Sequence, residues 1–398
     1  MKPITLTRFE DVRQAYRQRH LKQALFDAEG LVMKDTILVL HGEEHRHRRR
    51  LENRLFRREV FERYENELMP PAIASNLDAA RIAGKCDLIS TARHIVVNLT
   101  AQAAGIDQTE TGVEQTERLY EQAIKFSEGA TSMHSTRNPE ELNVEIEDSF
   151  NRWEEEFFEP SLRRRQYLLE QLLTGEISED DLPPDILMVL VRNNDELGLS
   201  RDVMRRETAF YLQAGMHSTV GAIAHAVHET FDWRIKENLS VQDLLDDKKL
   251  LQSCVHESMR LHPASPVAMR EAVEFVELPG GIKVEQGMQL ILDLDSANRD
   301  PEIFGKDAAV FNPKRMIPEH VEPWGHSFGG GVHKCIGMEL DGGVPPQQDD
   351  PVLLFGTVGL VLEGLLERGA QRDLKDPPTL DPNTTRIWWG RYPLIFVS

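Results

Sequence analysis

Apolar residues recur three or four positions apart along much of residues 60–170, 200–235 and 240–261, and this spacing predicts a mainly helical protein. Ser200 stands where a helix should start, and the run that follows it contains no proline. Because this long helix is apolar on more than one face, we expect it to be central and buried. The third region must end near Pro263, since proline cannot continue the hydrogen-bond ladder.

The pattern changes after this proline. Residues 264–296 show short apolar runs broken by proline and glycine, which predicts a few strands and turns. Residues 298–331 should form mostly loop, whereas residues 351–369 have a helical pattern and residues 386–397 that of a strand pair. No repeat or shift in composition divides the chain. We therefore expect a mainly α protein, with residues 1–398 forming one large helical domain that includes a small β-sheet region.

The composition argues against several classes of protein. A net charge of -20 repels polyanions, so general nucleic-acid binding is not expected. No apolar run approaches the roughly twenty residues of a membrane span, and the N-terminal segment lacks a signal-peptide pattern. Cys86, Cys254 and Cys335 are widely separated and odd in number, which predicts neither a disulfide framework nor paired zinc ligands. We expect a cytoplasmic protein that makes no membrane contact.

One stretch departs from the acidic background. From His45 to Arg58 the chain reads HRHRRRLENRLFRR, a dense basic run that would give a helix a positive face. Such a face could simply be solvated. The sharper hypothesis is a docking surface for a small acidic protein.

The strongest chemical signal is the segment SFGGGVHKCIGMEL, residues 327–340. Three consecutive glycines let the backbone adopt positive φ angles and approach a flat ligand, and Gly337 leaves clearance after the sulfur. Backbone N–H groups of the loop and a short helix starting at Ile336 should favour the thiolate form of Cys335. A thiolate binds soft metals, and a single cysteine does not suit structural zinc. By itself, the segment also fits a glycine loop around a buried cysteine.

This segment resembles the ligand loop of the cytochrome P450 family of haem-thiolate monooxygenases, whose pattern is F-x-x-G-x-x-x-C-x-G. Phe328, Gly331, Cys335 and Gly337 match its fixed positions. The resemblance implies the cytochrome P450 fold, of the soluble bacterial type, with haem b as the cofactor and Cys335 as the axial ligand of its iron. It covers roughly the whole chain from residue 20 onward, with the motifs in family order.

A second match is the family's E-x-x-R pattern, formed by Glu257 and Arg260 in the helix before the proline. Residues three apart share a helix face, so the two side chains can join one network. The resemblance places the third partner, Arg315, in the loop that precedes the cysteine. We interpret Glu257, Arg260 and Arg315 as a buried structural triad rather than as catalysts, and loss of one member should cost several kcal/mol.

A third match concerns the two haem propionates, which need cationic or donor partners when partly buried. His45 and Arg49 fit the family's H-x-x-x-R contact, four residues apart on one helix face. Arg270 and His333 fall at the family's other propionate-contact positions. Each alone would usually be a surface residue, but four in the expected order favour a haem site.

The central helix departs from the family pattern A-G-x-D/E-T-T. The sequence here has Ala214, Gly215, His217, Ser218 and Thr219, so histidine stands at the acid position and serine at the first hydroxyl position. The small pair still leaves room for oxygen beside the haem. A histidine with an unperturbed pKa near 6.5 can move protons near neutral pH, and sterol demethylases of the family also place histidine there. We therefore predict that His217, Ser218 and Thr219 are catalytic, with His217 and Ser218 forming or supporting the proton relay. The alternative is that His217 only hydrogen-bonds within the structure and takes no part in turnover.

The resemblance implies a monooxygenase that inserts one oxygen atom of O2 into a hydrophobic or aromatic substrate, with electrons from a ferredoxin or flavodoxin. Its substrate pocket should be lined by Tyr211–Ser218, Ala264–Met269 and the tail at Ile387–Trp389. Because the relay acid is replaced, a hydrogen-peroxide-driven peroxygenase is the alternative, and a non-catalytic haem sensor is a further one. The short N-terminal segment predicts a more open substrate side, and residues 342–351 interrupt what is normally one helix.

Overall fold

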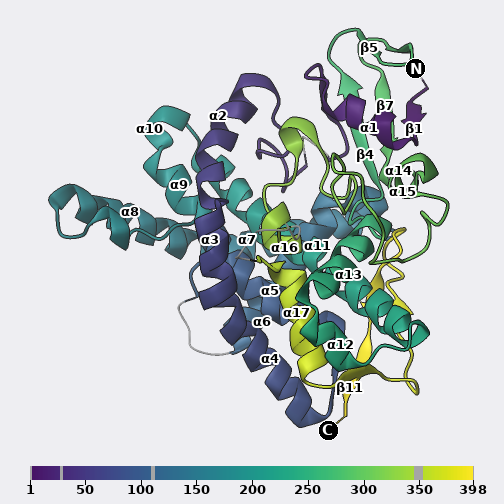
Figure 1. The fold of residues 1–398 in the computed structure, drawn as a ribbon. Helices are drawn as coiled ribbons and strands as arrows, with labels where there is room; N and C mark the ends of the chain where they lie inside the picture. Colours follow the sequence, from purple (N-terminus) through teal and green to yellow (C-terminus); the bar gives the residue numbers. More distant parts are fainter. Residues whose placement is uncertain (1, 27–29, 109–112, 345–352, 398) are drawn as a thin grey trace.

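Helix α11 (Arg201–Lys236) runs through the middle of the molecule, as Figure 1 shows. The Ser200 hydroxyl caps it by accepting a hydrogen bond from the backbone N–H of Val203 at 3.2 Å. Most of its residues are buried, so the predicted central helix is confirmed. The structure is a computed structural model and describes residues 2–26, 30–108, 113–344 and 353–397.

The other helices surround α11, and α5, α6, α13 and α17 pack directly on it. None of the helices in the described ranges is both long and apolar enough to cross a membrane. The helix bounds are α1 (Phe9–Tyr16), α2 (Gly42–Glu52), α3 (Arg58–Arg63), α4 (Met69–Ala83), α5 (Leu88–Ala104), α6 (Val113–Ala130), α7 (Pro139–Trp153), α8 (Glu159–Thr174), α9 (Ile186–Arg192), α10 (Asn194–Leu197), α12 (Val241–Asp246), α13 (Lys248–Leu261), α14 (Leu294–Ala297), α15 (Pro301–Phe304), α16 (Met338–Gly342) and α17 (Gly356–Glu367).

The helical region predicted before Pro263 is two helices. Ser240 caps α12 with a reciprocal capping box, and the chain breaks at Asp247. The Asp247 carboxylate then caps α13 by accepting from the Leu250 N–H at 2.9 Å. Helix α13 ends at Leu261, so the predicted stop before the proline is confirmed.

Small sheets lie at two ends of the molecule (Figure 1). One has the strand order β1-β7-β4-β2, in which β1 pairs parallel with β7, and β4 pairs antiparallel with β7 and β2. Strands β5 and β6 form a hairpin, β3-β11-β8 form a C-terminal sheet, and β10 pairs with β9. The strand bounds are β1 (Ile4–Leu6), β2 (Leu21–Gln23), β3 (Lys85–Asp87), β4 (Val267–Ala272), β5 (Val276–Leu278), β6 (Ile282–Val284), β7 (Gln289–Asp293), β8 (Ala370–Arg372), β9 (Thr379–Leu380), β10 (Trp389–Arg391) and β11 (Pro393–Phe396).

The tail at residues 386–397 forms two strands, but the prediction that they pair with each other is wrong. Strand β10 pairs with β9, and β11 lies between β3 and β8. Only Tyr392 separates the two strands, which is too little chain for a hairpin turn. The helix predicted over residues 351–369 forms over a shorter range as α17, because residues 353–355 are not helical, and residues 345–351 of the 342–351 interruption lie outside the described residues.

An aromatic cluster fixes α6 against α7. The fully buried Trp153 meets Phe126 edge to face, with ring centroids 5.4 Å apart, and stacks on Phe150 at 5.7 Å. Such pairs add to the free energy already gained by burying the rings. The C-terminal end of α6, which leads into the turn at residues 131–136, is therefore held firmly.

Three buried histidines make the stability depend on pH. His225, His256 and His326 each donate from Nε2 to a backbone carbonyl, and burial lowers their pKa from 6.5 to about 3, about 4 and about 4. Between these values and 6.5 the unfolded chain binds more protons than the folded one. The free energy of unfolding should therefore fall as the pH drops from 6.5 toward 4 in urea titrations. His256→Gln keeps a donor for the Gly342 carbonyl and should lessen this slope, and an unchanged slope would contradict the assignment.

Candidate functional site around Cys335

The loop before Cys335 is packed tightly, and the position just beyond it is open. The Cys335 N–H donates to the Phe328 carbonyl at 2.9 Å. Gly331 has φ +64°, and a Cβ there would lie 2.0 Å from the Tyr16 carbonyl oxygen, so only glycine fits. A Cβ on Gly337 would meet nothing within 4 Å. The structure thus leaves the space after the sulfur that the sequence predicted.

The Cys335 side chain is accessible at its surface, but its surroundings desolvate the thiol. It is exposed, and yet burial raises the pKa of its thiol to about 11. Desolvation disfavours the charged form of an ionisable group. The Gly337 N–H lowers the pKa of the thiol, in the direction that the sequence predicted for the backbone of this loop, but burial has the larger effect. Deprotonation requires a cation such as a metal ion at the sulfur.

His45 on α2 and His333 in the cysteine loop lie side by side, with ring centroids 4.2 Å apart. Both Nε2 atoms are buried and lack a hydrogen-bond partner among the described residues. Burial lowers the pKa of His45 to about 4 and that of His333 to about 3, so both rings are neutral near pH 7. Buried ring nitrogens of this kind require a polar partner.

Arg49 and Arg270 converge on the same place, since both of their charges act on the pKa of His333. Arg49 donates from Nη2 to the Lys334 carbonyl at 2.5 Å. Arg270 is buried on β4 and donates only to the carbonyl of its own neighbour, Met269, at 2.8 Å. It forms no ion pair with a carboxylate in the described part of the chain, and burial lowers its pKa. The four predicted propionate contacts are thus brought together.

Tyr16 belongs to this group, although the sequence did not mark it. Its ring lies 5.1 Å below the Arg270 guanidinium, and its hydroxyl is buried without a partner in the described ranges. A Cβ on Gly329 would lie 4.0 Å from this hydroxyl, which places it beside the cysteine loop. No motif surrounds Tyr16, and only the packing of α1 on the loop reveals it.

These side chains fit a haem. Haem b needs a soft axial ligand, clearance for a flat ring and partners for two propionates. Cys335 offers the sulfur, Gly337 the clearance, and His45 and His333 offer buried Nε2 atoms without a partner among the described residues, within reach of the Arg49 charge. Each of these groups is costly to bury without a partner, and a propionate would satisfy them.

Glu257, Arg260 and Arg315 form the predicted network. Arg260 donates from Nε and Nη2 to the two Glu257 oxygens, both at 2.7 Å, and Arg315 donates from Nε to Oε1 at 3.1 Å. All three side chains are buried. Arg260 also donates to the carbonyls of Asn298 at 2.5 Å and Ala308 at 2.7 Å, so it joins α13 to the loop that leads toward the cysteine.

On α11, Ala214, Gly215, His217 and Ser218 are partly exposed although the helix is buried around them. A Cβ on Gly215 would lie 2.8 Å from Cγ2 of Thr100, so glycine here also allows α5 to approach. The Ser218 hydroxyl donates to the Ala214 carbonyl at 2.8 Å, a bond internal to the helix. A small molecule can therefore reach this stretch of α11.

His217 is held by the C-terminal tail. Its Nε2 accepts a hydrogen bond from Arg386 at 3.0 Å, and its ring stacks on Trp388 at 4.1 Å. Burial, followed by the Arg386 charge, lowers its pKa well below 6.5. The expectation of an unperturbed pKa was therefore wrong, because the sequence did not show the cation beside the ring.

Thr219 is buried and hydrogen-bonds to Asp341 of α16, the helix that follows Cys335. Burial raises the pKa of Asp341 to about 6. Thr219 thus faces α16, whereas His217 faces the tail. Asp341 was not predicted, because no feature of the sequence places it against α11.

The basic run at residues 45–58 is not one continuous positive face. Arg48 is buried and pairs with Glu207 and Glu52, so the expectation that it is free for a partner is wrong. A charge so deep in the interior needs a carboxylate, and α11 supplies one. Arg54 and Arg57 remain exposed.

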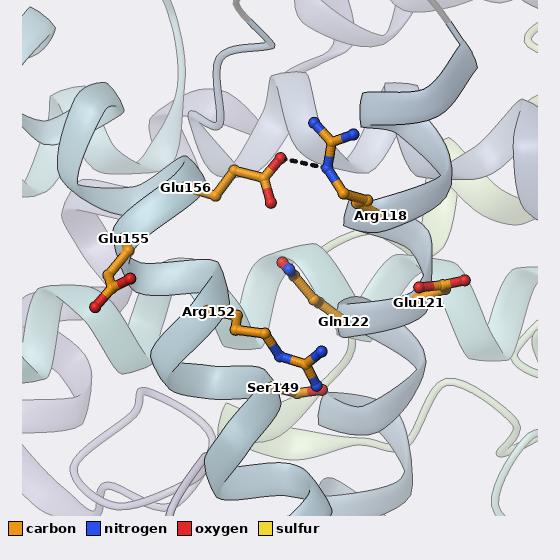
Figure 2. A pocket seen from close by; sticks show the side chains of 7 residues that line it. All are labelled: Arg118, Glu121, Gln122, Ser149, Arg152, Glu155 and Glu156. Atoms are coloured by element: carbon orange, nitrogen blue, oxygen red, sulfur yellow. Dashed lines mark hydrogen bonds and ion pairs between the residues drawn. The ribbon is translucent and has the colours of Figure 1, made fainter.

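A separate polar pocket of about 370 Å³ lies between α6 and α7, and Figure 2 shows its lining. Arg118 points at Glu156, with Nε donating to Oε1 at 2.6 Å. The pocket contains none of the predicted site residues. Its lining residues are Arg118, Glu121, Gln122, Ser149, Arg152, Glu155 and Glu156.

Comparisons with known proteins agree with this geometry. Residues 222–340 match the family model described as Cytochrome P450. "Probable cytochrome P450 313a5" of Drosophila melanogaster is 27% identical over 186 residues, which are 46% of this chain and 37% of that protein. The chain thus spans little more than a third of this curated relative.

Solved structures match over nearly the whole chain. The structure titled "P450BioI in complex with hexadec-9Z-enoic acid ligated Acyl Carrier Protein" has a TM-score of 0.73 at 20% identity, covering 99% of this chain and 92% of that one. Epothilone D-bound cytochrome P450epoK has a TM-score of 0.75 at 16% identity, covering 99% and 91%. The predicted fold class is confirmed.

Proposed function

Since this chain belongs to the cytochrome P450 family, we propose that it is a haem-thiolate monooxygenase that inserts one oxygen atom of O2 into a hydrophobic or aromatic substrate. The observation that carries the proposal is the desolvated Cys335 sulfur beside buried, unpaired polar groups. Haem b held by a cysteine thiolate supplies oxygen activation. The chain's own residues supply binding, orientation and proton handling.

We assign Cys335 as the axial ligand. His45, Arg49, Arg270 and His333, whose side chains gather at one place beside the loop, would hold the propionates. Loss of an anion from such a buried, cation-rich group is unfavourable, so these contacts also retain the haem.

On α11, we assign proton delivery to the Ser218 hydroxyl. Its bond to the Ala214 carbonyl is local and can be exchanged for a bond to another polar group. His217, held through Nε2 by Arg386, and Thr219, held by Asp341, fix the helix on either side of it. His217 is neutral in this arrangement and acts as a positioning residue.

An apolar substrate is supported by the pocket segments on α11, β4 and the tail. Trp388 is buried there, whereas Ile387 is 71% exposed and contributes little to the interior. Two structural neighbours hold hexadec-9Z-enoic acid on an acyl carrier protein and epothilone D, both largely apolar molecules.

The spectrum of the reduced haem protein with carbon monoxide tests the proposal. A Soret band shifted far to the red, as thiolate ligation gives, supports it. A band at the position of histidine-ligated haem proteins contradicts it.

One observation favours a peroxygenase as the second candidate. The acid position of α11 holds a neutral histidine whose Nε2 is already bonded to Arg386. Turnover supported by hydrogen peroxide alone, at a rate at least equal to that with O2, reductase and ferredoxin, would favour this candidate.

We further propose that a ferredoxin or flavodoxin, both acidic, docks on the exposed arginines after α2. Arg54→Glu should slow reduction by the acidic partner, and reduction of the wild type should slow as ionic strength rises. Stopped-flow reduction rates measure both effects. Arg163→Glu on α8 is the matched control, since Arg163 is also exposed but lies on another helix. Equal slowing by both variants would contradict docking at Arg54.

A further inference from the structure

Arg386 is partly buried, and its hydrogen bonds go to neutral groups, among them the Thr384 hydroxyl at 3.4 Å, while the Asp381 carboxylate acts on its charge only at longer range. Its guanidinium donates to the Ala264 carbonyl at 3.2 Å, to the Thr131 hydroxyl at 3.3 Å and to His217 Nε2 at 3.0 Å. It also lies over the Trp388 ring at 4.2 Å. No carboxylate of the described residues forms an ion pair with it, and burial lowers its pKa to about 10.

This arrangement differs from that of other buried arginines in the chain. The latter are neutralised by carboxylates: Arg48 by Glu207, Arg165 by Asp185 and Arg260 by Glu257. Arg270 is an exception, and it lies in the group that fits the haem propionates. By the same reasoning, Arg386 lies where an anion is to be bound, because an unneutralised buried cation is costly.

The position of Arg386 is that of the predicted substrate pocket. Its contacts come from α11, from the chain after α13 and from the end of α6. Both Arg386 and His217 are partly exposed, so a small molecule can reach them, and burial lowers the pKa of each side chain. Arg93 on α5 adds a second positive charge that acts on His217, and it pairs with the Tyr120 hydroxyl rather than with a carboxylate.

Backbone contacts hold this arginine in place. The turn after α6 pairs with the loop before β10 through a bridge between Ser135 and Thr384. The Thr385 N–H donates to the His134 carbonyl at 2.8 Å, and the Thr136 N–H donates to the Asn383 carbonyl at 3.1 Å. A charged donor fixed in this way loses little conformational entropy when it binds a ligand.

We propose that Arg386 binds the carboxylate of the substrate, so that the preferred substrates are apolar molecules carrying one acidic group. Four of the five guanidinium N–H groups are bonded to described residues, and the remaining Nη1 N–H can donate to a carboxylate oxygen. The rest of such a molecule would lie along the apolar pocket segments. This inference rests on the proposed function, because it places the acid beside the haem site.

Calorimetric titration of the haem-loaded protein with two matched pairs of compounds tests the proposal. The pairs are dodecanoic acid with methyl dodecanoate, and 4-hexylbenzoic acid with its methyl ester. At least one acid should bind about tenfold or more tightly than its ester. Arg386→Gln should abolish this preference, and Arg386→Lys should keep part of it. Arg391→Gln is the matched control, since Arg391 lies on the same tail but is exposed and paired with Asp376.

Equal binding of acid and ester, no binding of either acid, or a preference that survives in Arg386→Gln would overturn the proposal. The carbon monoxide spectrum is recorded for each variant. A red-shifted band without acid preference refutes only the role of Arg386, whereas a missing band in the wild type refutes the proposed function. The band also shows that Arg386→Gln has folded.

Discussion

A Cys335→Ser variant should lose the red-shifted Soret band of the reduced carbon monoxide complex entirely and should lose monooxygenase turnover. A serine hydroxyl does not ionise to give a soft ligand, and the other two cysteines lie outside the loop, Cys86 on β3 and Cys254 on α13. The substitution changes one atom in a loop whose shape is fixed by glycines, so the fold should persist. Absorption spectra of both proteins, with haem content measured separately, give the result.

Cys86→Ser is the control. Cys86 is half-buried, and its replacement should leave the spectrum and turnover unchanged. A Cys335→Ser protein that keeps the red-shifted band would show that another residue ligates the iron. A Cys86→Ser protein that loses the band would show that cysteine loss acts through the fold.

The helices whose ends were predicted correctly are those whose start or stop is set by nearby residues in the sequence. Ser200 caps α11, and Pro263 marks the end of α13, because a cap and a missing N–H act within one turn of helix. The pairing of residues 386–397 was predicted wrongly, because a strand's partner is set by the whole fold rather than by its own sequence.

The residues of the candidate site can also be separated into those with a local sequence signal and those without one. Cys335 and the propionate contacts lie in motifs and could be predicted. Tyr16 and Arg386 could not, because α1 and the tail reach the site only through tertiary packing. Arg48 was placed on the surface because its run of basic neighbours gives no sign of the carboxylates that surround it. A run of basic residues in the sequence shows only which charges are present. The burial of each side chain decides whether its charge meets solvent or a buried carboxylate.

Glu257→Gln should lower the free energy of unfolding by about 3–5 kcal/mol, because it leaves two guanidinium groups without their shared carboxylate. Arg260 has 0% side-chain exposure and no other carboxylate partner among the described residues, so water cannot replace the lost charge, whereas Arg315 keeps its ion pair with Asp307 at 2.7 Å. Glutamine keeps the shape and one acceptor oxygen, which separates the loss of charge from the creation of a cavity. Urea unfolding followed by circular dichroism measures the change.

Glu67→Gln is the matched control. Glu67 pairs with Arg63 at 3.3 Å, but both side chains are more than half exposed, so the expected loss is about 0.5 kcal/mol or less. If Glu257→Gln cost no more than this, the carboxylate would not be what neutralises the triad. The bonds from Arg260 to the carbonyls of Asn298 and Ala308 would then be sufficient to hold α13 against the loop that carries Cys335.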